Sequence, residues 1–363
     1  MKIPARMVDI DRDFWTRRRV LVTGHTGFKG AWLSLWLQAL GAEVIGMAPG
    51  VPTRPSLYEL ADVGAHMRGL EVDVRDAGAV RDALVEARPE VVFHLAAQPM
   101  VRRSLRDPAM TYEVNVMGTA NVLDAVRDAG ADVRAVVIVT SDKCYENPAG
   151  GTRPFVEGDP LGGSDPYSSS KACVELLAAA YRRSFFAAEG SPRLGTARAG
   201  NVIGGGDWGE DRLVPDAVRA AATGEPLCIR NPSAVRPWQH VLSPLSGYLR
   251  LAEALAQGQE AARAWNFGPL AGDAQPVSWI VERLAELWGG ELSWQLDAAQ
   301  NPPEAGHLAL DSGAAERLLA WRPACSLQDA LELVVDWHRA HREGDDMRVV
   351  SLAQIGRHAS LTV

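Results

Sequence analysis

The sequence predicts an α/β protein with a doubly wound parallel sheet and a smaller, mostly C-terminal lobe. Short β-branched runs alternate with longer helical patterns through the first half of the chain, up to about Asn201. Beyond that point the alternation ends, and glycines, prolines and tryptophans accumulate. Alternating strands and helices form right-handed βαβ units, whose helices cover both faces of a parallel sheet. The 363 residues are enough for one large domain or two closely joined ones.

The expected elements follow in order along the first half of the chain. Strands are expected at RVLVTG, EVIGMA, VVFHLAA, AVVIVTS and RLGTARAGN, which cover residues 19–24, 43–48, 91–97, 135–141 and 193–201. A further strand, the third along the chain, is expected just before Asp73, so the strand at residues 193–201 is the sixth. Helices are expected at residues 27–41, 72–87 and 111–130, and from Pro166 through residue 186. Ligands of such sheets bind where the strands end, so residues directly after strands are the candidates for a site.

Composition and charge exclude several classes of protein. With 47% hydrophobic and 23% charged residues the chain is typical of a globular protein, and no apolar run approaches the roughly 20 residues of a membrane helix. The N-terminal stretch mixes both charge signs and lacks the apolar core of a signal peptide, so we expect a cytoplasmic protein. Four widely spaced cysteines without a CxxC pair predict free thiols and no metal site. A net charge of -8 gives no general attraction to nucleic acid, and the expected partner is a small molecule.

A glycine-rich loop lies between the first strand and the first helix. Glycines at positions 24, 27 and 30 let the backbone turn tightly and approach a pyrophosphate, and the helix N-terminus offers its amides to the phosphates. The GxxGxxG spacing resembles that of short-chain dehydrogenase/reductases, and so do the segments after the third and fourth strands. The expected cofactor-binding residues are Gly24, His25, Gly27, Phe28, Lys29, Gly30, Asp73, Val74, Leu95, Ala96, Ala97, Tyr167 and Lys171.

The end of the second strand departs from the pattern of that superfamily. A carboxylate normally stands there to hold the adenosine ribose, whereas this chain has Met47-Ala48-Pro49. We expect NAD as the cofactor, with NADP as the alternative. The basic residues His25 and Lys29 either favour an extra phosphate or lie on a solvated face. His94 is expected to be a core histidine rather than a catalytic one.

Tyr167 and Lys171 form a YxxxK pair at the start of a predicted helix. The spacing of four places the phenol and the ammonium on one helix face. There we expect the cation to lower the pKa of the tyrosine, so that it takes a proton from an alcohol hydroxyl. Ser141, at the end of the fifth strand, completes a triad for alcohol oxidation, in which its hydroxyl orients the substrate oxygen. A surface tyrosine is the alternative interpretation of the YxxxK pair alone.

Asp142 and Lys143 follow Ser141 and distinguish among nucleotide-sugar enzymes of the extended branch of this superfamily. In 4-epimerases the residue after the serine is small or apolar, whereas dehydratases carry an aspartate that protonates the departing C6 hydroxyl. Asp142 therefore favours elimination, with a buried capping aspartate as the alternative. Most dehydratases place a glutamate where this chain has Lys143, as the base that removes the C5 proton.

Six segments together resemble the CDP-glucose 4,6-dehydratases over nearly the whole chain. These are GHTGFKGAWLSLWLQALGAEVIG, FHLAAQPMVRRS, VTSDKCYEN, PYSSSKACVE, AGNVIGGGDWGEDRLVPD and IRNPSAVRPWQHVLSPLSGYL. The resemblance implies NAD-dependent dehydration of CDP-D-glucose to CDP-4-dehydro-6-deoxy-D-glucose, by C4 oxidation, loss of water from C5 and C6, and return of hydride to C6. Asp142 would donate a proton to the C6 oxygen, and neutral Lys143 would remove the C5 proton. Alternatively, Lys143 pairs with Asp142 or stabilises the enolate.

Residues that resemble the substrate contacts of this family lie mainly in the loop-rich second half. Arginine forks suit phosphate oxygens. The predicted substrate-binding residues are Gln98, Asn201, Arg212, Arg230, Arg236 and Trp238. For Trp238 packing is the alternative, because the chain has 11 tryptophans. We expect residues 1–192 to form the dinucleotide-binding domain, completed by segments near 233–268, and residues 193–363 to form mainly an interleaved nucleotide-sugar-binding lobe.

The chain departs from the pattern of this family in two loops, Pro148-Ala149-Gly150-Gly151 and Pro303-Glu304-Ala305. Two other functions stay open. One is another nucleotide-sugar 4,6-dehydratase or 4-epimerase, and the other is a catalytically silent, cofactor-sensing binding protein, which would lack the tyrosine or lysine present here. The resemblance also implies a homodimer, formed through helices after the fourth and fifth strands, with apolar faces that include Val174, Leu177 and Tyr181.

Overall fold

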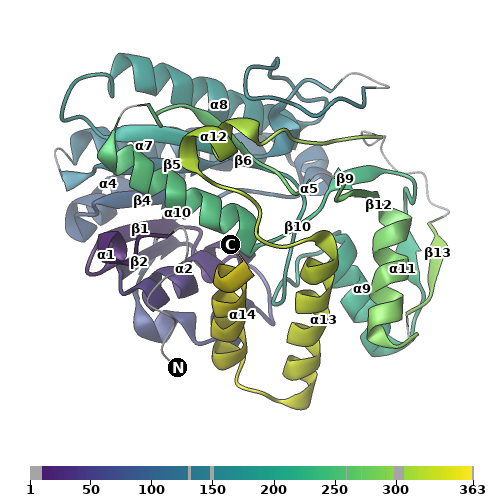
Figure 1. The fold of residues 1–363 in the computed structure, drawn as a ribbon. Coiled ribbons are helices and arrows are strands. Elements are labelled where there is room, and N and C mark those ends of the chain that lie inside the picture. Colours follow the sequence, from purple (N-terminus) through teal and green to yellow (C-terminus); the bar gives the residue numbers. More distant parts are fainter. Residues whose placement is uncertain are drawn as a thin grey trace.

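A seven-stranded parallel sheet forms the centre of the molecule (Figure 1). The computed structural model describes residues 10–129, 132–147, 151–258, 260–270, 272–290, 292–297 and 306–361. The strands are β1 (Arg19–Thr23), β2 (Glu43–Ala48), β3 (Arg68–Glu71), β4 (Val91–His94), β5 (Ala135–Val139), β6 (Arg193–Ala199) and β11 (Ala264–Phe267). Their order is β11-β6-β5-β4-β1-β2-β3, so the chain reverses its direction of winding between β1 and β4. A crevice for a ligand is expected at such a switch point.

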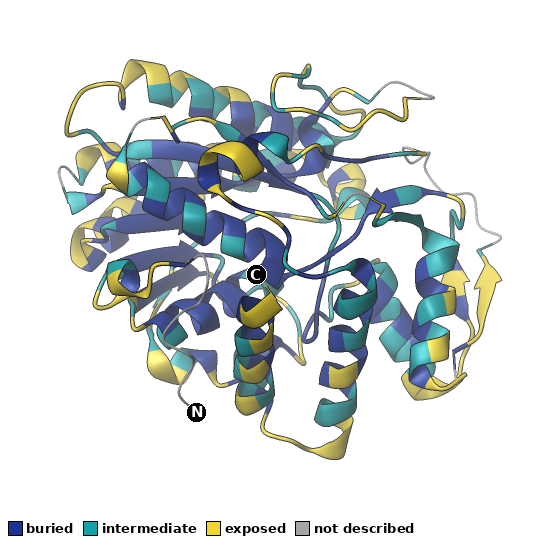
Figure 2. Cartoon of the chain, in the orientation of Figure 1, coloured by how far each residue is buried: buried dark blue, intermediate teal, exposed yellow. Residues whose placement is uncertain are grey.

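Helices cover both faces of the sheet. On one face lie α2 (Phe28–Leu40) and α10 (Leu242–Gln257), and on the other lie α4 (Ala77–Ala87), α7 (Gly118–Asp128) and α8 (Pro166–Ser184). The alternation along β1 explains the two layers, because Val20 and Val22 join the core beneath α2 and α10, whereas Leu21 joins the core beneath α4, α7 and α8. Figure 2 shows the strands in dark blue between helices whose outer sides are exposed.

The C-terminal lobe has a core of its own. The helices α9 (Leu213–Thr223), α11 (Val277–Trp288) and α13 (Leu327–Glu343) pack around Ile280, Leu331 and their neighbours. Three two-stranded ribbons accompany them: β8 (Leu227–Ile229) with β13 (Trp294–Leu296), β9 (Val235–Pro237) with β12 (Ala274–Pro276), and β7 (Val202–Ile203) with β10 (Gln239–His240). The last helix, α14 (Met347–Leu361), lies beside α13 and also contacts α2 (Figure 1).

Short helices connect these elements. They are α1 (Arg12–Trp15), α3 (Leu57–Leu60), the 3₁₀ turn η1 (Val63–His66), α5 (Val101–Arg106), α6 (Pro108–Tyr112), the π-helix η2 (Glu113–Met117), the 3₁₀ turn η4 (Asp142–Cys144) and α12 (Gly313–Leu319). Within the described ranges no helix combines the length and apolarity needed to cross a membrane.

The predicted fold class is confirmed, and the differences are local. The helix expected at residues 72–87 begins only at Ala77, because Asp76 caps its N-terminus by accepting from the amide of Ala79. The helix expected at residues 111–130 is divided into α6, η2 and α7. The segment expected to complete the first domain contributes α10 and β11 to the sheet layers. The domain boundary near residue 192 stays a prediction.

Candidate active site

A large pocket opens at the carboxyl edge of the sheet. It runs from the glycine loop past the ends of β4, β5 and β6 to α9 and the ribbons of the C-terminal lobe. All of the predicted catalytic residues line it, and so do all of the predicted cofactor and substrate residues except His25. The topology explains this convergence, because parallel strands all end at the same edge.

The glycine loop forms a close-packed cradle beside the N-terminus of α2. Gly24 has φ +71°, and a Cβ there would lie 2.9 Å from the backbone nitrogen of Ala96. A Cβ on Gly30 would lie 2.1 Å from the carbonyl oxygen of Gly24, so only glycine lets the helix approach the loop. The N-cap residue Gly27 has no side chain to occupy the first amides of α2. These amides are therefore left to bind an anion such as a pyrophosphate.

His94 is the core histidine that we expected. Its Nδ1 lies 2.7 Å from Oγ1 of Thr23 and its Nε2 lies 3.0 Å from Oγ1 of Thr119, so both ring nitrogens have partners. Burial, reinforced by the charge of Lys171, lowers the pKa of His94 to about 3. The Thr23 hydroxyl also accepts hydrogen bonds from the backbone nitrogens of Leu95 and Ala96, at 3.2 and 3.1 Å. His94 thus fixes the loop after β4 instead of entering the chemistry.

The two basic residues of the glycine loop behave differently from each other. His25 is buried against Gly46 and Tyr58, away from the pocket, and burial lowers the pKa of its imidazole to about 4. The structure therefore supports neither a phosphate contact nor a solvated face for the His25 side chain. Lys29 lines the pocket, and burial, followed by the charges of Lys171 and Arg212, lowers its pKa to about 8. Of His25 and Lys29, it is therefore Lys29 whose side chain can contact a phosphate in the pocket.

The part of the pocket beside β2 and β3 contains a carboxylate after β3 rather than after β2. Ala48 and Pro49 line the pocket at the end of β2 and carry no acid. Asp73 also lines it, but its Oδ2 lies 2.7 Å from Nη2 of Arg75. The carbonyl of the adjacent Val74 accepts a hydrogen bond from Nδ2 of Asn121 at 2.8 Å.

Tyr167 and Ser141 both line the pocket. Burial raises the pKa of Tyr167 to about 12, and the neighbouring Ser141 hydroxyl and the charge of Arg212 only partly offset it. The net shift is opposite to the one we expected from Lys171. The Lys171 Nζ donates instead to the carbonyl of Val139 at 3.2 Å, and burial lowers its pKa to about 8. The expectation failed because desolvation of a buried phenol outweighs its neighbouring charges.

Asp142 lies in a 3₁₀ turn directly after β5 and is only 2% exposed. Its Oδ1 accepts a hydrogen bond from the Ser141 hydroxyl at 2.8 Å, whereas its Oδ2 has no hydrogen-bond partner in the described part of the chain. Burial raises the pKa of this carboxyl, although the charges of Lys143 and Arg236 act in the other direction. Lys143 is half-buried and lines the pocket, and its backbone nitrogen donates to the Ser141 hydroxyl at 3.2 Å. Asp142 can therefore hold a proton and present it to a ligand.

The three predicted arginines approach the pocket from the lobe side. Arg212 pairs with Asp207 at 2.9 Å, and this carboxylate raises the pKa of the guanidinium. Arg236 is buried and donates to the carbonyl of Val235 at 2.9 Å. Arg230 reaches the carbonyl of Asp211 at 3.5 Å. Guanidinium groups at this end of the pocket can bind the oxygens of a diphosphate, although Asp207, which pairs with Arg212, also lines it.

Gln98 and Trp238 have structural partners that the sequence did not suggest. The Gln98 side chain donates to the Met100 carbonyl and to Oγ1 of Thr111, both at 3.0 Å, and accepts from the Met100 nitrogen at 2.6 Å. The indole nitrogen of Trp238 donates to the carbonyl of Gln275 at 3.1 Å, and the ring belongs to the core of the lobe. These contacts favour loop organisation for Gln98 and packing for Trp238.

Among the acidic residues at the pocket that were not predicted, two form ion pairs with arginines that also line it. Asp207 pairs with Arg212, and Asp211 pairs with Arg102 at 3.0 Å. Both lie in the GGGDWGED run, whose glycines and acids were a usable signal. The Pro148–Gly150 part of one unusual loop and all of Pro303–Ala305 lie outside the described residues, so their contacts stay predictions.

The cysteines are free, as predicted; Cys144 and Cys325 are buried. Among the described residues no group of three or more His, Cys, Asp or Glu side chains could hold a metal ion.

Comparisons with known proteins agree with this geometry. Residues 20–268 match the family described as the NAD dependent epimerase/dehydratase family. The chain is 47% identical to the CDP-glucose 4,6-dehydratase of Salmonella typhimurium, over 97% of this chain and 99% of that protein. Among solved structures, DesIV, a dTDP-glucose 4,6-dehydratase from Streptomyces venezuelae with NAD bound, superimposes with a TM-score of 0.76 at 27% identity, covering 91% of this chain and 99% of that one. The UDP-glucose 4-epimerase of Thermotoga maritima shares the fold with a TM-score of 0.78 at 24% identity, covering 89% of this chain and 99% of that one.

Proposed function

The chain belongs to the NAD-dependent epimerase/dehydratase family, and we propose that it dehydrates CDP-D-glucose to CDP-4-dehydro-6-deoxy-D-glucose. The observation that carries this proposal is the 47% identity, over 97% of the chain, to a CDP-glucose 4,6-dehydratase. The pocket chemistry supports it, because a protonatable carboxyl at position 142 suits loss of a hydroxyl group better than simple epimerisation.

NAD is the cofactor, and the glycine cradle fits it. The amides at the N-terminus of α2 would hold the pyrophosphate, Asp73 and Val74 would lie at the adenosine, and the loop from Leu95 to Ala97 would lie along the dinucleotide. When bound, NAD would supply the hydride acceptor for C4 and the hydride donor for C6, and C5 would regain a proton as C6 receives the hydride.

Tyr167 takes the proton from the C4 hydroxyl, and Ser141 orients that hydroxyl. Burial disfavours the phenolate form of Tyr167, and the Arg212 charge favours it. The Lys171 ammonium, held at the end of β5 by the Val139 carbonyl, adds positive charge on the same helix one turn away.

Asp142 and Lys143 carry out the elimination. A ketone at C4 acidifies the C5 proton, which Lys143 removes, while Asp142 donates a proton to the C6 oxygen as water leaves. Burial favours the protonated carboxyl, and Oδ2 is the oxygen left for the substrate because Oδ1 is engaged by Ser141. The alternative for Lys143 is to steady the enolate, with another base acting at C5.

The nucleotide diphosphate is proposed to lie toward the lobe. Arg212, Arg230 and Arg236 supply the positive charge that two phosphates need, and Asn201 lines the same part of the pocket. Gln98 and Trp238 shape the walls of the pocket rather than bind through their polar atoms, since those atoms are engaged within the protein.

We also propose a cytoplasmic homodimer in which α7 and α8 form the interface. Four free cysteines are typical of a reducing compartment. The sequence suggested Val174 for the interface, but Val174 is buried in the core of its own sheet layer. The apolar side chains of α8 that face outward are Leu176, 60% exposed, and Phe185, just beyond its end and 46% exposed.

A substrate panel tests the proposed function. The purified protein is incubated with NAD and either CDP-glucose, dTDP-glucose or UDP-glucose, and a 4-keto-6-deoxy product is detected by its absorbance in base. We expect product from CDP-glucose. Preference for another nucleotide would identify a sister dehydratase, and a C4 epimer without loss of water would sink the dehydratase proposal. NAD binding without any product would indicate a silent sensor.

A further inference from the structure

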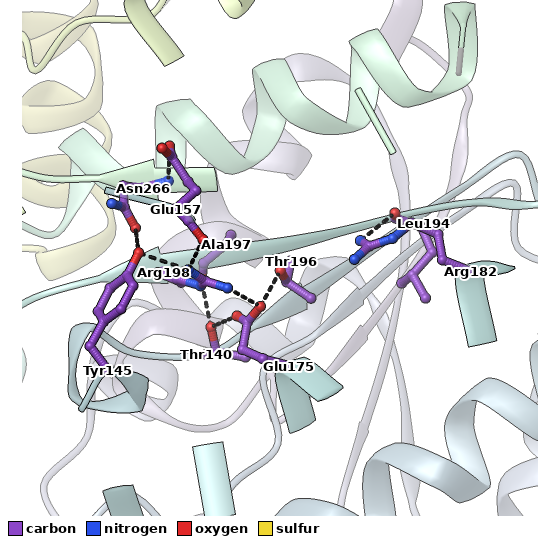
Figure 3. Close-up of polar contacts among 10 residues, drawn as sticks. All are labelled: Thr140, Tyr145, Glu157, Glu175, Arg182, Leu194, Thr196, Ala197, Arg198 and Asn266. Atoms are coloured by element: carbon purple, nitrogen blue, oxygen red, sulfur yellow. Dashed lines mark hydrogen bonds and ion pairs between the residues drawn. The ribbon is translucent and has the colours of Figure 1, made fainter. Parts of the chain in front are cut away.

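A buried polar network lies directly behind the catalytic segment (Figure 3). Its centre is an ion pair between Glu175 on α8 and Arg198 on β6, with Oε2 and Nη2 2.7 Å apart and side chains only 2% and 4% exposed. Figure 3 shows Glu175 between Arg198 and two threonines. Its carboxylate accepts from the hydroxyls of Thr140 at 2.5 Å and Thr196 at 2.8 Å.

Arg198 continues the network toward the other end of the catalytic segment. Its Nη1 donates to the Tyr145 hydroxyl at 2.7 Å and to the Glu157 carbonyl at 3.0 Å. The Tyr145 hydroxyl in turn donates to Oδ1 of Asn266 on β11 at 2.7 Å. The Tyr145 ring also stacks on Phe155, with centroids 4.7 Å apart.

The network holds both ends of the segment that carries Ser141, Asp142 and Lys143. Thr140 directly precedes this segment and Tyr145 follows it closely, and each is bound to one member of the ion pair. The ion pair therefore ties the 3₁₀ turn η4 to β6 and to the helix that carries Tyr167 and Lys171.

Stability alone does not explain such a pair. Removing two charges from water costs several kcal/mol per ion, and well-packed apolar residues often give an equal or more stable core. Glu175 and Arg198 satisfy most of their hydrogen-bonding capacity, and the bonds they make reach the residues that flank the catalytic segment. This placement points to a role in geometry and charge at the site.

Glu175 also lies one helical turn after Lys171. Burial lowers the pKa of Lys171 to about 8, and among the neighbouring charges Glu175 is the strongest that opposes this shift. Cys144 acts in the same direction, but burial raises the pKa of its own thiol, so the thiol is neutral near pH 7. Among the described residues, the titratable groups that face Lys171 include Tyr167 and Glu175 on its own helix, Cys144 in η4, Lys29 on α2 and His94 on β4.

We propose that Glu175 and Arg198 are positioning residues of the proposed dehydratase, which hold segment 141–144 against α8 and place a carboxylate one helical turn from Lys171. The inference rests on the proposed function for its kinetic part only. Neither residue is among those that line the pocket. They act through Thr140 and Tyr145 on the catalytic segment, and through the helix on Lys171.

Glu175→Gln tests the charge, and Glu253→Gln is the matched control. Glu253 on α10 is also a buried carboxylate, which accepts from Trp15, the Asp11 nitrogen and Arg250 at 2.7 to 3.0 Å, on the other face of the sheet. The chain has four lysines, Lys2, Lys29, Lys143 and Lys171, so ¹³C-lysine labelling gives few signals, and Lys171→Arg assigns the one of interest. Its titration needs neither substrate nor turnover.

We expect Glu175→Gln to lower the pKa of Lys171 further and to move the alkaline limb of the kcat–pH profile down in the same direction. kcat should fall about 10- to 100-fold with little change in KM, because the catalytic segment shifts while the substrate contacts remain. Glu253→Gln should lower stability and leave the Lys171 titration unchanged. An unchanged Lys171 titration in folded Glu175→Gln, or an equal shift in Glu253→Gln, would overturn the charge role.

Tyr145→Phe tests the geometry without changing any charge. It removes the hydroxyl that joins Arg198 to Asn266 and keeps the ring that stacks on Phe155. We expect a lower kcat with an unchanged Lys171 titration and unchanged NAD binding, and wild-type kcat in this variant would refute the positioning role. If the wild-type protein makes no dehydration product, the proposed function fails, whereas the lysine titration still decides the inference.

Discussion

Asp142→Asn is the perturbation that most sharply tests the proposed acid. Asparagine keeps the oxygen that accepts from the Ser141 hydroxyl at 2.8 Å and replaces the unpartnered Oδ2 with an amino group. The side chain is 2% exposed and no larger group is introduced, so the pocket keeps its shape. What disappears is the ability to donate a proton to the C6 oxygen.

The expected loss follows from the usual worth of a positioned acid. General acid catalysis contributes roughly 100- to 10,000-fold, so kcat should fall at least about 100-fold, which corresponds to about 2.7 kcal/mol of transition-state stabilisation. NAD affinity should stay at the wild-type value, because the glycine cradle and Tyr167 are untouched. Product formation is followed in base, and cofactor affinity is measured by calorimetry.

The difference in stability between the wild type and Asp142→Asn should also depend on pH. Because burial raises the pKa of Asp142 in the folded protein, the folded state binds this proton more tightly than the unfolded chain does. The contribution of Asp142 to stability is therefore present at low pH and is lost as pH rises through its folded pKa. The Tm of the wild type minus that of Asp142→Asn should increase from pH 8 to pH 5.

Asp273→Asn is the control, since Asp273 is another aspartate whose pKa is raised by burial, and it lies outside the pocket. It should leave kcat unchanged. Turnover at the wild-type rate in Asp142→Asn would refute the acid role, and a difference in Tm that does not change with pH would refute the assignment of a raised pKa.

Three further predictions concern the cradle, the base and the buried histidines. Gly30→Ala places a Cβ 2.1 Å from a backbone oxygen and should weaken NAD binding at least about 10-fold. Gly356→Ala is the control, because nothing lies within 4 Å of a Cβ at that position, and it should leave NAD binding unchanged. Equal NAD affinities in the two variants would contradict the role of the glycine cradle. Lys143→Met should abolish exchange of the C5 hydrogen with solvent deuterium and lower kcat about 100-fold, and retained exchange would assign the base elsewhere. Acidification from pH 7 to pH 5 should lower the Tm. Burial holds the pKa values of His94 and His240 at about 3, so each of these histidines lowers the free energy of unfolding by about 1.4 kcal/mol for every pH unit below 6.5. A Tm that does not change over this range would contradict this prediction.

The sequence was informative where local spacing alone decides the structure. The GxxGxxG loop predicted the cradle at Gly24 and Gly30 because both the turn and the helix contact depend on the absence of a Cβ. The spacing of four between Tyr167 and Lys171 predicted that both residues lie on one face of a helix, because helical periodicity alone determines which residues share a face.

Side-chain direction and long-range pairing were not predictable in this way. His25 stands in the glycine loop, yet it turns inward beneath β2, because Gly46 leaves space for the ring. Glu175 and Arg198 are 23 residues apart and meet only because α8 packs on β6. The raised pKa of Tyr167 follows from burial of its phenol, which no motif around residue 167 encodes.

Transfer of one labelled hydrogen tests the central claim most directly. CDP-glucose deuterated at C4 is converted with the purified protein and NAD, and the product is analysed by mass spectrometry and NMR. We predict a product that has lost one water and carries the deuterium at C6 of the same molecule. Deuterium that stays at C4 of an epimer, or that is lost to solvent, would contradict the proposed dehydration.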